Sequence, residues 1–118
     1  MQNIVPVNDQ LSRRDLFEAF RQQLAKDFEQ SNFEANFVQD LEPDYSYIRE
    51  KIVHELQRSE KRADADLLRL LYRIDISEFQ LKRYLNENRN QNHLNTIAEL
   101  IIKRVLQKVV TRHFYKNK

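Results

Sequence analysis

Apolar residues recur at three- and four-residue steps over most of the chain, and short polar or proline-containing segments separate these runs. Such steps place side chains on one face of an α-helix. The pattern therefore predicts an all-α fold, a single-domain bundle of five to six helices over residues 11–118. Residues 1–10, which include Ile4-Val5-Pro6-Val7, are predicted to form an extended N-terminal arm.

The first predicted helix begins at Ser12 and runs to about residue 30. Ser12 is expected to cap a free backbone N–H, and Asp15 at the third helical position to accept a hydrogen bond from the backbone of Ser12 in return. Leu11 is expected to pack on Leu16. The inward stripe of this helix consists of five apolar residues: Leu16, Phe17, Phe20, Leu24 and Phe28.

A short second helix is predicted between Ser31 and Pro43. Ser31 and Glu34 repeat the capping pattern, Phe33 and Phe37 lie four residues apart, and Pro43 ends the helix. The density of phenylalanine in this part of the chain indicates core packing, because each ring recurs on a helical face.

The segment from Asp44 to Ile74 allows two predictions. Asp44 is expected to cap a third helix that buries Tyr45, Ile48, Ile52 and Leu56. Residues 57–62 contain no apolar residue, so a new helix can begin near Asp64, or one helix can run unbroken over 44–74 with its polar middle projecting toward a second subunit. Acidic residues in the first turn favour the break.

A tight corner is predicted at residues 74–77, with Asp75 or Ser77 capping a helix over 77–87 and Ile76 pointing inward. The asparagine-rich segment 86–95 is predicted to be a loop in which asparagine provides a left-handed helix end. The last helix begins at Asn95 or nearby. Its apolar residues cover an arc of about 220°, which places it at the centre of the bundle.

The chain contains no glycine and no cysteine in 118 residues. Glycine-rich phosphate loops, dinucleotide fingerprints and nucleophile elbows therefore lose their usual residue. The absence of cysteine excludes disulfides, thiol catalysis and cysteine-rich zinc sites, and fits a reducing compartment. With no apolar run of signal-peptide or membrane-span length, we expect a soluble, cytoplasmic protein that does not bind membranes.

Charge is distributed unevenly along the chain. Residues 1–43 hold 4 Lys/Arg against 8 Asp/Glu, and residues 77–118 hold 9 against 3. Internal neutralisation between the two ends is one explanation. The other is a nucleic-acid partner, because the C-terminal cations are interleaved with aromatic residues that suit phosphates and bases. This alternative assigns phosphate contacts to six residues: Lys82, Arg83, Lys103, Arg104, Lys108 and Arg112.

Residues 64–86 also allow a helix-turn-helix interpretation, with residues 64–75 as the supporting helix. The second, short helix would then expose four polar side chains: Gln80, Lys82, Arg83 and Asn86.

Candidate chemistry is sparse. His54, His93 and His113 fall on different predicted elements, and none stands at metal-ligand spacing from another histidine. The serines fall mostly at predicted caps, and no pair of carboxylates stands out for acid–base work. We therefore predict no catalytic residue, no metal, no cofactor and no small-molecule substrate.

The leading hypothesis is a non-enzymatic protein-interaction module that acts as a homodimer or with a larger protein partner. Ile101, Val105 and Val109 on the last helix are the candidate interface residues, although a monomeric core would use the same positions. The alternative is a nucleic-acid-binding protein that uses the basic C-terminal third.

Overall fold

A computed structural model describes residues 4–58 and 64–116, with side chains placed for 7–58 and 65–115. Within these ranges the chain forms helices and no β-strand, in the order α1 (Ile4–Leu11), α2 (Arg14–Glu29), the 3-10 helix η1 (Asn36–Asp40), α3 (Tyr45–Arg58), α4 (Asp64–Arg73), α5 (Glu78–Glu87) and α6 (His93–Lys116). The predicted all-α bundle is confirmed.

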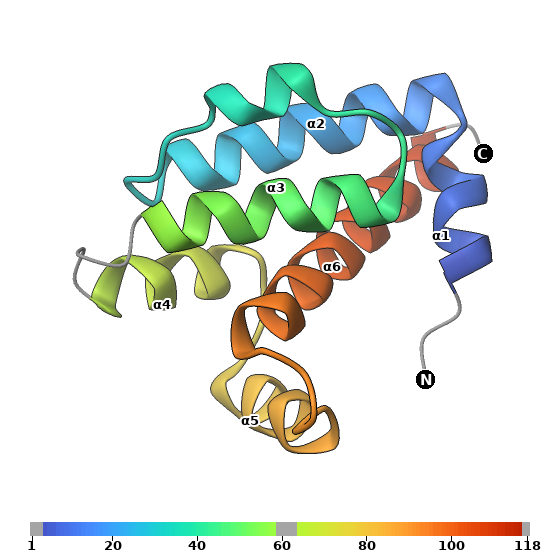
Figure 1. The fold of residues 1–118 in the computed structure, drawn as a ribbon. Coiled ribbons are helices and arrows are strands. Elements are labelled where there is room, and N and C mark those ends of the chain that lie inside the picture. The colour runs from blue at the N-terminus through green and yellow to red at the C-terminus, as the bar shows by residue number, and fades with distance from the viewer. Residues whose placement is uncertain (1–3, 59–63, 117–118) are drawn as a thin grey trace.

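Helix α6 is central, as its wide apolar arc predicts. It packs on α2, α3 and α5, and Figure 1 shows it crossing the pair formed by α2 and α3. Its buried apolar residues are Ile97, Ala98, Ile101, Ile102, Val105, Leu106 and Val109. An arc this wide meets neighbours on two sides, which is why one helix holds the bundle together.

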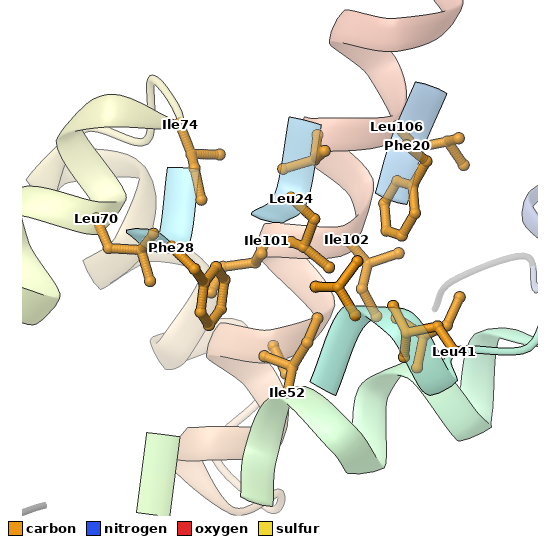
Figure 2. Close-up of a cluster of buried hydrophobic side chains, with 14 of the residues drawn as sticks. Phe20, Leu24, Phe28, Leu41, Ile52, Leu70, Ile74, Ile101, Ile102 and Leu106 are labelled. Atoms are coloured by element: carbon orange, nitrogen blue, oxygen red, sulfur yellow. The ribbon is translucent and has the colours of Figure 1, made fainter. Parts of the chain in front are cut away.

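The hydrophobic core forms where α2, α3, α4 and α6 meet. Figure 2 shows Phe28 of α2, Ile52 of α3, Leu70 of α4 and Ile101 of α6 pointing into one cluster, and all four are fully buried. Burial of large apolar side chains is the main driving force for folding, so this cluster determines how the helices are arranged.

The predicted break in the segment 44–74 is confirmed, because α3 and α4 are separate helices and α4 runs back beneath α3 (Figure 1). Most of the polar stretch 57–62 lies outside the described residues. Asp44 caps α3 as predicted, since its carboxylate accepts the backbone N–H of Tyr47 at 2.9 Å.

The predicted extended arm is wrong for residues 4–10, which belong to α1. Pro6 is compatible with a first helical turn. Leu11 is fully buried, Val7 packs against the core, and Asn8 Oδ1 accepts the backbone N–H of Tyr45 at 3.0 Å. This helix packs on α2 and α3, so Val7 and Leu11 gain burial that an arm would not provide.

The predicted Ser12 cap is also wrong. The Ser12 hydroxyl donates to the carbonyl of Asp9 at 2.7 Å, at the end of α1. Helix α2 begins at Arg14, and its N-cap residue Arg13 makes no side-chain capping hydrogen bond. Because residues 4–11 are helical, Ser12 follows a helix instead of starting one.

The predicted second helix over residues 31–41 is replaced by a turn and by η1. Asn32 adopts a left-handed conformation with φ 69°, and the backbone N–H of Phe33 bonds the carbonyl of Phe28 at 2.9 Å. The two rings pack edge to face with centroids 5.6 Å apart. Asn32 therefore takes the left-handed position that glycine usually takes after a helix. Ser31 and Phe33 belong to this end of α2 and do not start a second helix.

Asp75 ends α4 in the same way, with φ 67° and the N–H of Ile76 bonded to the carbonyl of Leu71 at 2.8 Å. The predicted corner is confirmed: Ile76 is buried, and Ser77 caps α5 through a reciprocal pair of bonds with Gln80. In a chain without glycine, asparagine and aspartate take the left-handed positions, because their short polar side chains tolerate them best.

The loop between α5 and α6 covers residues 88–92 and is shorter than predicted, because α6 begins at His93. The prediction of a left-handed asparagine at this helix end is wrong, since Asn88 has φ −120°. Asn92 instead starts α6, where its side-chain oxygen accepts the N–H of Leu94 at 2.8 Å.

Candidate interaction surfaces

The three predicted interface residues lie inside the core of one chain. Ile101, Val105 and Val109 are all buried against neighbouring helices. The structure therefore places them in the hydrophobic core of one chain, the role that a monomeric bundle also predicts for these positions. The apolar period predicts which face of α6 is covered but does not say which chain covers it.

The six predicted phosphate contacts fall into separate groups, on α5 and on α6. Lys82 and Arg83 are exposed on the outer side of α5. Arg83 Nε lies 3.2 Å from a carboxylate oxygen of Glu87 on the same helix, so part of the positive charge of α5 is neutralised.

The helix-turn-helix interpretation predicts the order of the two helices correctly, but the structure leaves a groove between them. The two predicted helices, α4 and α5, are joined by residues 74–77, and Gln80 and Asn86 are exposed on α5 as predicted. A groove opens between the two helices, however, and α5 packs on α6.

Lys103 belongs to a different environment from the other cations of α6. Its ammonium group lies 5.9 Å from the centre of the Tyr84 ring on α5. Burial lowers the pKa of Lys103, and the negative charge of Glu99 opposes that effect. Lys103 is therefore engaged within the fold.

Arg104, Lys108 and Arg112 lie four residues apart and form one line along the outer side of α6; we call these three residues the basic face. Together with Gln107 and Thr111 they line a shallow groove of about 260 Å³. The structure thus gathers three of the six predicted cations on one surface.

A second groove, with a volume of about 330 Å³, lies between α4 and α5; we call it the α4–α5 groove. Its apolar lining is formed by Ala65, Leu68, Leu71, Tyr72, Ile76 and Leu81. Leu68 is 47% exposed and Tyr72 is 82% exposed, although large apolar side chains favour burial. Sequence reasoning missed this groove, because the pattern of α4 shows apolar residues without showing that one side of the helix stays uncovered.

A polar cluster joins α3, α6 and the loop before α6. The buried carboxylate of Glu99 accepts one hydrogen bond from Gln91 Nε2 at 2.8 Å and another from Arg49 Nη1 at 3.1 Å. Burial and the neighbouring Glu99 raise the pKa of Tyr45, and the same causes, with Glu87, raise the pKa of Tyr84 to about 12.

Both oxygens of Glu99 are engaged, so this carboxylate anchors helices and is poorly placed to accept a proton from a substrate. Sequence reasoning missed the cluster. The only feature of the sequence that points to it is Glu99, a charged residue that follows Ala98 at the edge of the apolar arc of α6.

The three histidines are well separated by the fold. His54 and His93 are exposed, and His113 Nε2 lies 3.2 Å from Asp15 Oδ2. That pair borders a groove of about 590 Å³ between α2 and α6 whose lining contains no hydroxyl or thiol side chain. Within residues 4–58 and 64–116, no three His, Asp or Glu side chains gather closely enough to hold a metal ion.

None of the helices in the described part of the chain combines the length and apolar character needed to cross a lipid bilayer. Comparisons with protein families, with curated proteins and with solved structures find no significant match to this chain.

Proposed function

We propose that this protein is a non-enzymatic interaction module that binds an amphipathic helix of another protein in the α4–α5 groove. The observation that carries this proposal is an apolar groove bordered by exposed Leu68 and Tyr72. Large apolar side chains that stay exposed beside one another are typical of surfaces that bind a partner.

The helix that forms one wall of the groove supports the same conclusion. No residue of α5 is buried, and its apolar residues Leu81 and Leu85 are half-buried against the rest of the bundle. Phe79, on the same helix, is 73% exposed. A partner that covers α5 would remove this apolar surface from water and supply binding free energy.

The size of the groove favours a single helix as its occupant. An apolar cavity of about 150 Å³ accepts one benzene-sized group, so about 330 Å³ accepts roughly two large side chains. Two such side chains, one turn apart, are what an amphipathic helix inserts into a groove. Arg69 and Glu78 lie in the lining and offer both signs of charge to the polar flanks of that helix.

A homodimer is the alternative occupant, and one experiment separates the two. Photoreactive benzoylphenylalanine replaces Tyr72, and the chain is irradiated in its native cells. We expect one dominant adduct with a different protein, crosslinked through an amphipathic helix. The matched control carries the same group at Gln57, which is exposed on α3.

Adding Leu68→Glu to the Tyr72 crosslinker should abolish that adduct, because a buried carboxylate in the groove is costly. An adduct with the mass of two identical chains would replace the proposal by self-association. Equal labelling from positions 57 and 72 would refute a specific groove partner.

A further inference from the structure

The outer side of α6 carries positive charge with little acidic compensation. Residues 100–116 of this helix include five Lys or Arg and no Asp or Glu. Three of these cations form the basic face. Successive members lie about 6 Å apart along the helix axis, so Arg104 and Arg112 are separated by about 12 Å.

The fold leaves most of this charge uncompensated. In the part of the chain that the structure describes, Asp75 is the one carboxylate within 4 Å of the basic face, at 3.9 Å from Arg104 Nη2, and Asp75 is itself exposed. Arg112 Nη2 donates to a neutral group, the side-chain oxygen of Gln23, at 2.6 Å. Such a hydrogen bond orients the guanidinium without cancelling its charge.

Two exposed aromatic rings continue the basic face toward the C-terminal end of α6. Phe114 is 64% exposed and Tyr115 is 67% exposed, and the two rings contact each other edge to face at 6.0 Å. Tyr115 follows Lys108 by two helical turns, so both lie on one side of the helix. The surface therefore combines a line of cations with uncovered π-faces.

We infer that the basic face, with Phe114 and Tyr115, binds single-stranded nucleic acid. The cations attract consecutive phosphates, and the rings stack on unpaired bases. A duplex hides the faces of its bases, and an acidic protein surface or an anionic membrane makes no use of stacking. This site lies on α6 and shares no residue with the α4–α5 groove, so it stands independently of the proposed partner protein.

The test measures fluorescence anisotropy of a labelled single-stranded oligonucleotide of about 15 nucleotides, as DNA and as RNA, against the full chain. We expect binding at low salt. A plot of the logarithm of the association constant against the logarithm of the salt concentration should have a slope of about −2, because three phosphates are neutralised. The same sequence as a duplex should bind at least about fivefold more weakly, since stacking is lost.

Two pairs of substitutions separate the contributions. Lys108→Glu with Arg112→Glu should weaken binding at least about tenfold and flatten the salt dependence. Phe114→Ala with Tyr115→Ala should weaken binding about tenfold with the salt slope unchanged, because a ring carries no charge. The matched control is Lys51→Glu on α3, which makes the same charge change as Lys108→Glu alone; the control should alter affinity less than about twofold, and Lys108→Glu should weaken it more.

Circular dichroism establishes that each variant is folded before binding is compared. Absence of binding at low salt overturns the inference. Polyglutamate or anionic vesicles that bind as tightly as the oligonucleotide would assign the face to acidic proteins or to membranes instead. Unchanged affinity in the ring variant would also overturn it, because stacking distinguishes this ligand from other polyanions.

Discussion

Helices α5 and α6 follow each other in the chain and both carry apolar residues at helical spacing, yet they are covered very differently. Helix α6 packs on three other helices and buries a continuous apolar face, whereas α5 has no buried residue. The apolar period of a helix therefore predicts its inward side but not the number of neighbours that cover it. In this protein the incompletely covered helix borders the candidate docking groove.

The sharpest test of this difference is the same truncation in both helices. Leu106 on α6 is buried and Leu85 on α5 is half-buried. We expect Leu106→Ala to lower the free energy of unfolding by about 3 kcal/mol, because it leaves a cavity, and Leu85→Ala to lower it by about 1 kcal/mol. Urea unfolding measures both, and equal losses would place α5 within the core.

Ion pairs should show the same contrast at a smaller scale. Arg49→Met leaves the buried carboxylate of Glu99 without its cation, and we expect a loss of about 2 kcal/mol. Arg83→Met removes an exposed partner of Glu87 on α5, and should cost less than about 0.5 kcal/mol. A loss as small at Arg49 as at Arg83 would show that the polar cluster contributes little to stability.

Helix caps should separate global from local stability. Asp44→Ala removes the cap of α3, which lies in the core, and should lower the free energy of unfolding by about 1 kcal/mol. Ser77→Ala removes the cap of α5 and should mainly speed amide hydrogen exchange within α5, by about fivefold, because α5 can open without the rest of the bundle. Equal exchange in α5 and α6 of this variant would contradict that separation.

Alkaline pH should weaken the contact between α5 and α6 through Tyr84. Its pKa is about 12 in the folded chain against an ordinary value of 10.0, so from about pH 10 to about pH 12 the unfolded chain loses a proton that the folded chain keeps. Stability must fall as the pH rises through that window. Tyr84→Phe should remove part of this loss in urea titrations, while the raised pKa of Tyr45 keeps the remainder.

At neutral pH, Tyr84→Phe should change the free energy of unfolding by less than about 0.5 kcal/mol. The buried hydroxyl of Tyr84 has no hydrogen-bond partner in the described part of the chain, so its removal leaves no polar group unsatisfied. A large loss at neutral pH would show that this hydroxyl makes a hydrogen bond in solution.

The sequence predicts those features that depend on residues close together in the chain. The Asp44 cap, the Ser77 corner and the apolar face of α6 are all determined within a few turns, and all three are confirmed. The errors at Ser12 and Ser31 have one cause, because the local sequence around a capping serine does not show whether the serine follows a helix or precedes one.

Sites that depend on distant residues could not be predicted in this way. The Glu99 cluster brings together Arg49 of α3 and Gln91 of a loop, and the α4–α5 groove exists only because of how two helices diverge. Spacing along one helix contains no information about either arrangement. Four-residue spacing on a single helix explains why Arg104, Lys108 and Arg112 share one line. Lys82, Arg83 and Lys103, which were predicted together with them, lie elsewhere.

A last contrast concerns the two left-handed residues, which end helices with different neighbours. Asn32 is exposed and follows α2, whose inner face lies in the core, and Asp75 ends α4 beside the groove. Asn32→Gly should raise the free energy of unfolding by about 0.5 kcal/mol, and Asn32→Ala should lower it by about 1 kcal/mol, because a Cβ without a polar group disfavours positive φ. Asp75→Gly should gain less, since α5 can open locally and a weak contact with Arg104 is lost. Thermal unfolding of the three variants measures the differences, and a stabilising Asn32→Ala would mean that this residue is not left-handed in solution.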